Sequence, residues 1–406
     1  MPAPSAEARR PAALLFFLAL LALLAQPAVP APAAEAPESA GRPGMDLGAV
    51  LGGGAAAGFR VADRPRPFEF PADHGAHPAF RSEWWYLTAH LEDASGAPFG
   101  LQFTLFRQAL APPLAAPDPD ASAWRTRQVW MAHLAVTSAV DGHRVAERFA
   151  RGALGLAGVR AAPFEAWLDD WRLAAEGPGL FPLRLEAAVP AQEARPAGKS
   201  FALDLRLETA KGPVPQGEDG LSRKSDRAGN ASHYYSFTRL PAAGTLRLGD
   251  RRYELQGLGW LDREWSTSAL DPGQTGWDWF ALHLDDGRDL MLYRIRRDDG
   301  SVDAASAGVL VGPEGGRTVL GPGDWRLEPL AWWSDGEGGR WPVTWRLVLP
   351  DHGVDGRVRA VVDDALNRVS VRYWEGMVCL EADAAAEARG TAEGCGYLEL
   401  TGYGGP

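Results

Sequence analysis

Alternating apolar and polar residues, separated by tight-turn dipeptides, constrain the fold of this chain more than any other feature. In residues 81–91, for example, Trp85, Leu87 and Ala89 fall on one face of an extended strand. Asp141-Gly142 follows another such run, and dipeptides of this kind mark β-hairpins. Helical periodicity is nearly absent beyond the N-terminus. The pattern therefore predicts an all-β protein of antiparallel strands arranged in barrels or sandwiches.

The length of the strand-rich region indicates more than one domain. About 340 residues of meandering strands exceed what one small barrel needs. We place the boundary near residue 257, which gives a first β-domain over 61–257 and a second over 258–406. The stretch 34–60 is rich in Ala, Gly and Pro and is expected to be a flexible linker.

The N-terminus has the features of a secretory signal peptide over residues 1–33. Arg9 and Arg10 precede an apolar run at 12–25, and Ala31-Pro32-Ala33 offers a small-residue cleavage site. The run is shorter than the ~20 residues that a bilayer-spanning helix needs, although an uncleaved membrane anchor is the alternative. We therefore expect an exported protein, periplasmic or secreted, that is soluble after cleavage.

Charge and aromatic content narrow the classes of partner. The chain has 41 Lys and Arg against 52 Asp and Glu, a net charge of −11, and it has no basic stretch. An acidic chain of this kind argues against nucleic acid and anionic membrane surfaces as partners. The 16 Trp residues indicate either aromatic anchors in a β-rich core or an apolar ligand cavity lined by rings, and both can hold together.

The two cysteines, Cys379 and Cys395, lie in the last strand region, which has the pattern of a hairpin. An exported protein permits disulfide formation. A structural disulfide is favoured over two free thiols.

The segment 257–265 carries the strongest chemical signal. Strand alternation places Trp260, Asp262 and Glu264 on one face and Arg263 on the other. Desolvation by the neighbouring rings would raise the pKa of Asp262 and make it a candidate acid near neutral pH. The alternative is a buried ion pair with an arginine from elsewhere in the chain, for example Arg107.

Seven sequence runs together resemble one family. The chain resembles the carotenoid 1,2-hydratase (CrtC/AttH-like) superfamily of lipocalin-like proteins. The resemblance implies two tandem lipocalin-like, calycin-type antiparallel β-barrels, one in each of the two domains. The runs that carry it are His77-Pro78 with residues 81–86, then residues 103–107, 167–171, 233–236, 260–265, 276–279 and 396–403.

The resemblance also implies a catalytic set. In the hydratase branch, catalysis is associated with a His-x-Trp pattern followed further along the chain by Tyr-x-Asp. Here the matching positions are His233-x-Tyr235 and Trp260-x-Asp262, so the two aromatics are exchanged in kind. Asp262 would protonate an alkene, the rings of Trp260 and Tyr235 would stabilise the resulting cation, and His233 would activate water. This chemistry requires no cofactor or metal. A buried core histidine is the alternative for His233.

Four aromatics flanking these motifs are candidate ligand contacts, namely Trp84, Tyr86, Trp277 and Trp279. Core packing is the alternative for the last two.

A cluster of Asp73, His74 and His77 contains metal-ligand residue types. It is too small to predict a metal site, and a loop held by side-chain hydrogen bonds is the favoured interpretation.

Two functions of different class follow. One is an exported carrier that binds an apolar isoprenoid or lipid, as an accessory of an ABC-type permease. The other is a cofactor-independent hydratase acting on an isoprenoid double bond. The predicted leader and the exchanged aromatics favour the carrier, whereas the retained His233 and Asp262 favour the enzyme.

Overall fold

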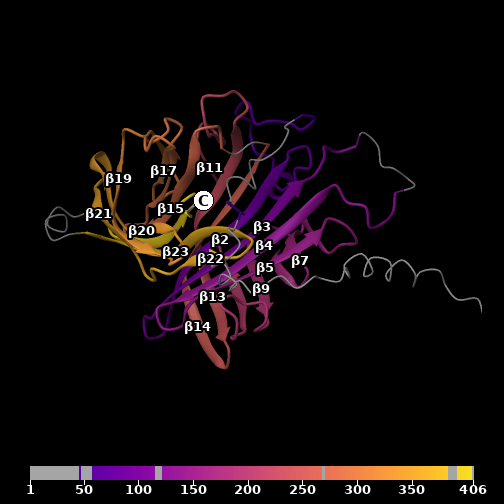
Figure 1. Ribbon diagram of the computed structural model, residues 1–406, viewed down its shortest axis with the longest axis horizontal. Helices are drawn as coiled ribbons and strands as arrows, with labels where there is room; N and C mark the ends of the chain where they lie inside the picture. The colour runs from indigo at the N-terminus through magenta and orange to yellow at the C-terminus, as the bar shows by residue number, and fades with distance from the viewer. Residues whose placement is uncertain (1–44, 47–56, 115–120, 268–269, 383–390, 405–406) are drawn as a thin grey trace, which may run out of the picture. The chain divides into compact units, whose positions relative to one another are not determined.

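A computed structural model describes residues 45–46, 57–114, 121–267, 270–382 and 391–404 of the chain (Figure 1). The predicted signal peptide over 1–33 and most of the predicted linker over 34–60 lie outside the described residues. Within the described ranges, no helix has the length and apolar character needed to cross a membrane.

The first sheet forms a nearly closed antiparallel barrel. Its strand order is β5-β4-β3-β2-β14-β13-β10-β9-β8-β7-β6, and the short strands β11 and β12 also pair with β13. Its thirteen described strands are β2 (Ser82–Asp93), β3 (Pro98–Ala109), β4 (Gln128–Ser138), β5 (Gly142–Arg151), β6 (Ala157–Ala161), β7 (Phe164–Leu168), β8 (Trp171–Ala175), β9 (Leu183–Val189), β10 (Phe201–Leu207), β11 (Val214–Pro215), β12 (Leu221–Arg223), β13 (Ala231–Leu248) and β14 (Arg251–Ser266).

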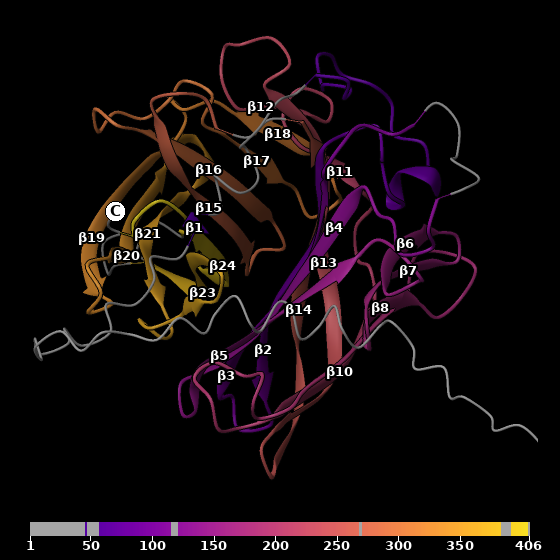
Figure 2. The same ribbon diagram turned by 45° about the vertical axis from the view of Figure 1, so that its right-hand side comes forward.

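The second sheet forms a half-barrel, which is the curved orange and yellow sheet of Figure 2. Its order is β18-β17-β16-β15-β24-β23-β21-β20-β19, and β1 and β22 also pair with β23. Its described strands are β1 (Met45–Asp46), β15 (Gln274–Leu284), β16 (Asp289–Arg297), β17 (Ala307–Val311), β18 (Arg317–Leu320), β19 (Arg326–Ser334), β20 (Arg340–Leu349), β21 (Val354–Ala360), β22 (Leu366–Arg368), β23 (Val371–Ala382) and β24 (Gly394–Leu400). Across the described ranges, the helical elements are two single turns, η1 (Ala72–His74) and η2 (Pro350–His352). The all-β, lipocalin-like prediction is confirmed, with a half-barrel as the second unit.

The chain passes from the first sheet to the second between Ser266 and Gln274. The boundary expected at residue 257 falls inside β14. Gly257 lies in this strand and not in a connection. A Cβ atom at Gly257 would overlap the carbonyl oxygen of His90 on β2, so glycine permits the close approach of two strands there.

Strand β2 shows how alternation divides its side chains between two environments. Trp85, Leu87 and Ala89 belong to the core inside the first barrel. Tyr86, which points the other way, packs in a separate apolar cluster that contains residues of both sheets, among them Trp260 and Trp279. The candidate site lies in this second environment.

The two cysteines lie opposite each other in the antiparallel pair β23–β24. Cys379 is the register partner of Cys395, and a disulfide joins them.

Candidate active site

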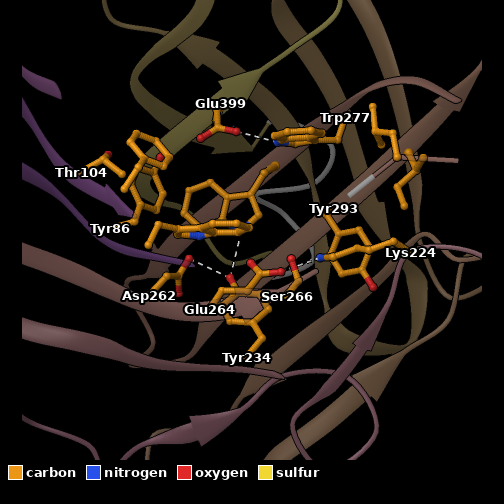
Figure 3. Close-up of a pocket in the computed structure, with 15 residues that line it drawn as sticks. Tyr86, Thr104, Lys224, Tyr234, Asp262, Glu264, Ser266, Trp277, Tyr293 and Glu399 are labelled. Atoms are coloured by element: carbon orange, nitrogen blue, oxygen red, sulfur yellow. Dashed lines mark hydrogen bonds and ion pairs between the residues drawn. The ribbon is translucent and has the colours of Figure 1, made fainter. Parts of the chain in front are cut away.

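A cavity of about 100 Å³ lies among strands of both sheets (Figure 3). Seven of its fifteen lining residues are aromatic, and six others carry polar or charged side chains. The lining residues are Trp84, Tyr86, Thr104, Phe106, Lys224, Tyr234, Asp262, Glu264, Ser266, Leu270, Trp277, Trp279, Tyr293, Ile295 and Glu399.

Asp262 is a buried carboxyl group held by three hydrogen bonds. The Tyr234 hydroxyl donates to Oδ2 at 2.7 Å, and Trp260 Nε1 and the Ser236 hydroxyl donate to Oδ1 at 2.7 and 2.5 Å. Burial raises the pKa of Asp262 to about 7 and outweighs these hydrogen bonds, which act to lower it. Asp262 is therefore partly protonated at neutral pH in an aromatic setting, as a general acid requires.

Among the residues that the structure describes, Asp262 does not form the buried ion pair with an arginine that was the alternative interpretation of its sequence. Arg107 and Arg263 both contact the carboxylate of Glu83, which is fully buried on the opposite face of the sheet. In the part of the chain that the structure describes, no ion pair within 4.0 Å involves Asp262. The Asp262 side chain is bound by neutral donors alone.

A second carboxylate, Glu264, lies two residues further along the same face of β14. Lys224 Nζ is 3.0 Å from Glu264 Oε1, and the Ser232 hydroxyl donates to the same oxygen. Burial acts to lower the pKa of Lys224, but the charge and hydrogen bond of Glu264, together with Tyr293 and Asp262, outweigh it and the net pKa is raised. The Lys224 ammonium also lies 4.7 Å from the centre of the Tyr293 ring. One strand therefore presents a protonatable acid and an ion-paired carboxylate to the same cavity.

Glu399, on β24, contributes a carboxyl group from the second sheet. Trp277 Nε1 donates a 2.6 Å hydrogen bond to Glu399 Oε1. Burial raises the pKa of Glu399 to about 7, and the charges of Asp262 and Glu264 add to the effect. Figure 3 shows Glu399 and Asp262 on opposite sides of the site.

His233 and Tyr235 lie on the other face of β13. In the register of β13 with β14, Ser236 pairs with Asp262 and Tyr234 with Glu264, so the even-numbered residues face the cavity. The His233 ring packs 5.7 Å from Trp265, whose side chain belongs to the first barrel's core. Burial lowers the pKa of His233 to about 4. The structure therefore does not bring His233 to the same pocket as Asp262.

Tyr235 is also directed away from the cavity. Its hydroxyl is 2.8 Å from His74 Nδ1, and burial raises its pKa above the usual range. The His74 loop is fastened in the same way, since Asp73 Oδ1 lies 3.0 Å from His77 Nε2 and 2.6 Å from an Arg66 nitrogen. Among the described residues, no group of three or more His, Cys, Asp and Glu side chains has the arrangement of a metal site.

The four aromatics predicted as ligand contacts, Trp84, Tyr86, Trp277 and Trp279, all line the cavity. Trp260 does not line the cavity but contacts residues that do. Its Nε1 donates a hydrogen bond to Asp262, and its ring packs edge-on against Trp279 at 6.4 Å between ring centres.

Sequence reasoning missed Tyr234, Lys224, Tyr293 and Glu399. The sequence holds a signal for Tyr234, because Tyr234 lies between His233 and Tyr235 and therefore points to the opposite face of the strand. The other three come from segments whose pairing the sequence does not specify.

The two lipocalin-like sheets and the cavity with its buried acid define the class of protein: an all-β, lipocalin-like protein with an aromatic-lined cavity among strands of both sheets. The profile of the AttH-like family matches residues 61–403, and the chain belongs to this family.

Solved structures agree with this assignment. A crystal structure from Nitrosomonas europaea that carries the AttH designation shares 31% identity, with a TM-score of 0.71 over 84% of this chain and 100% of that chain. Kievitone hydratase from Nectria haematococca has the same fold at 12% identity, with a TM-score of 0.57 over 85% of this chain and 98% of that chain. No curated protein matches the sequence.

Proposed function

We propose that this protein is a cofactor-independent hydratase that adds water to a carbon–carbon double bond of an apolar molecule, such as an isoprenoid. The observation that carries the proposal is the burial of the Asp262 carboxyl group in the cavity among neutral hydrogen-bond donors, which raises its pKa to about 7. Burying a carboxyl group lowers the stability of the folded protein, and buried groups with shifted pKa values are concentrated at functional sites. The fold shared with kievitone hydratase supports the proposal by analogy only.

The acid step transfers the Asp262 proton to one alkene carbon and leaves a tertiary cation on the other. After the transfer, the Asp262 carboxylate keeps its hydrogen bonds from Tyr234, Ser236 and Trp260. These bonds stabilise the negative charge that develops on the carboxylate. The cation forms among aromatic side chains, including Trp84 and Trp279, whose π-faces attract positive charge.

Water then adds to the cation and loses one proton to a base. We assign this base to Glu264, which shares the cavity wall with Asp262 and is held by Lys224. The balance is one water consumed for each alkene, and the cycle closes when the proton on Glu264 passes through cavity water to Asp262, which shares the cavity wall. Glu264 thereby takes the role that the sequence pattern suggested for His233.

The size of the cavity restricts how a substrate binds. Pockets that enclose a whole drug-sized ligand have volumes of about 300–1,000 Å³, whereas this cavity has about 100 Å³. The space suits the reacting end of a molecule, with the remainder outside the site.

A second candidate is an exported carrier of an apolar isoprenoid or lipid, in which case an ABC-type permease would be its partner. The aromatic lining of the cavity favours ligand binding in general. A carrier, however, has no need of a buried ion pair and two desolvated carboxyl groups in its binding site. The enzyme is therefore the better-supported function.

The test is mass spectrometry of organic extracts after the purified protein has been incubated with acyclic carotenoids and shorter isoprenoids. The hydratase predicts a product heavier by one water that disappears in Asp262→Asn. A lipid that co-purifies and returns unchanged, with no hydrated product from any compound, would support the carrier instead.

A further inference from the structure

A continuous set of buried hydrogen-bonding side chains leads away from the cavity between the two sheets. It begins at Tyr86, a cavity residue whose hydroxyl donates to Oε1 of Glu375 on β23 and which also contacts Glu399. Glu375 is 1% exposed, and Tyr373, which follows the same face of β23, has its hydroxyl next to the Glu375 carboxyl.

The set continues from Tyr373 to the protein surface through His133 on β4. His133 Nδ1 is 2.7 Å from the Tyr373 hydroxyl, and His133 Nε2 is 3.0 Å from Glu147 Oε1. His133 itself is fully buried, whereas the Glu147 side chain on β5 is 14% exposed. Glu147 is therefore the place where this set of groups meets solvent.

Every member of the set is able to exchange a proton. The two carboxyl groups, the imidazole and the two phenols each both donate and accept. Among the described residues, no ion pair within 4.0 Å engages Glu375 or Glu399, and burial raises the pKa of Glu375 well above its usual range. Burial therefore favours the neutral, protonated form of Glu375. Apolar side chains would fill the same space with less loss of stability.

We propose that Glu147, His133, Tyr373, Glu375 and Tyr86 form a proton path between solvent and Glu399 in the cavity. A proton that enters on Glu147 passes to His133 Nε2, while the Nδ1 proton moves to Tyr373 and displaces its hydroxyl proton to Glu375. The Tyr86 hydroxyl turns from Glu375 to Glu399 and releases its proton there, and Glu375 then passes its own proton to Tyr86. One proton enters and one arrives, and each intermediate group keeps its number of protons. His133 ends as the other neutral tautomer, so its ring turns back before the next transfer.

This inference goes beyond the proposed function, because hydration consumes no net proton, and it gives the second buried carboxyl group of the cavity, Glu399, a route to solvent. The path can nevertheless be measured without any substrate. A failure of the path therefore remains distinguishable from a failure of the hydratase proposal.

The experiment is rapid mixing of the protein into D₂O, followed by infrared detection of the protonated Glu375 carbonyl band, which shifts on deuteration. Glu375→Gln identifies the band by its loss. In the native protein we expect fast exchange, and Tyr373→Phe, which removes only the relaying hydroxyl, is expected to slow the exchange about tenfold or more. Tyr397→Phe is the matched control, because Tyr397 is equally buried and feels the charge of Glu375, but its hydroxyl bonds to Thr137 and relays no proton along the path.

A second variant tests the path at its outer end. Glu147→Gln changes a partly exposed residue, so it leaves the core intact, and it is expected to slow exchange of the Glu375 band as Tyr373→Phe does. Exchange at the native rate in both variants would overturn the proposal. Equal slowing of Glu375 exchange in Tyr397→Phe would also overturn the proposal, because the slowing would then follow from disturbed packing and not from the loss of a relaying hydroxyl.

Discussion

Ser236 stands directly opposite Asp262 in the β13–β14 pair, and its hydroxyl donates a 2.5 Å hydrogen bond to the Asp262 carboxyl. This register decides which face of β13 belongs to the cavity. It directs Tyr234 to the acid and turns His233 into the first barrel. The candidate chemistry therefore rests on carboxyl groups and aromatic rings, without a histidine.

The opposite orientations of Asp262 and His233 give a direct activity prediction. Asp262→Asn removes the proton donor and is expected to lower hydration rates about 100-fold to 10,000-fold. His233→Gln changes a residue outside the cavity and is expected to retain activity within a few-fold when the protein is folded. Initial rates on any hydrated isoprenoid measure both effects. Comparable losses of hydration rate in the two variants would contradict this prediction and show that His233 takes part in catalysis.

Glu83 is predicted to be a structural residue. Its carboxylate is fully buried and contacts both Arg107 and Arg263, so Glu83→Gln leaves two buried guanidinium groups without their counter-charge. Loss of one partner of a buried ion pair costs about 3–5 kcal/mol. Urea unfolding, monitored by tryptophan fluorescence, measures this loss. A change well below 1 kcal/mol would show that the three residues do not depend on one another.

The Cys379–Cys395 disulfide is predicted to stabilise the second sheet. The two residues are 16 positions apart, and closing a loop of about this length contributes about 3 kcal/mol by restricting the unfolded chain. The double variant Cys379→Ser/Cys395→Ser should unfold at correspondingly lower denaturant concentration. Reduction of the native protein should produce the same shift. Unchanged midpoints under both treatments would contradict the prediction.

The buried acids make stability depend on pH in a defined direction. Asp262 and Glu399 bind their protons more tightly in the folded protein, with pKa values raised to about 7. Their contribution to the free energy of unfolding therefore falls as pH rises from about 4 to about 7 and is constant above that range. For Asp262 alone the fall is about 4 kcal/mol.

Asp262→Asn isolates this contribution. The buried neutral histidines His90 and His283, whose pKa values burial lowers to about 3, act in the opposite direction but are common to both proteins. The variant is thus expected to gain stability relative to the native protein between about pH 5 and about pH 8. Denaturation series at the two pH values measure the difference. Parallel pH dependence in both proteins would show that Asp262 titrates normally.

The sequence correctly predicted which side chains share a face of one strand, because this depends only on alternation along the strand. On β14 it placed Trp260, Asp262 and Glu264 together and Arg263 apart, as the structure has them. The all-β fold followed from the same two-residue period and the turn dipeptides. A strand's own pattern is enough for such predictions, because successive side chains must point to opposite faces.

The sequence did not predict which face of β13 meets Asp262. Both faces of β13 are buried from Ala231 to Thr238, so hydrophobicity does not separate them. A register change of one residue exchanges the two faces, and register depends on strand pairing that the sequence alone leaves open. Lys224 and Glu399 were missed for a related reason: they reach the cavity from segments far from β14 in the chain, one of them in the second sheet.

The most direct test of the account is the titration of Asp262 itself. Infrared spectra of the native protein minus those of Asp262→Asn would isolate the Asp262 carboxyl as the pH is varied. The account predicts a protonated carbonyl band at mildly acidic pH that disappears with a midpoint at about 7. An Asp262 that is ionised throughout this range, with a midpoint near the ordinary aspartate value of about 4, would contradict its role as a general acid.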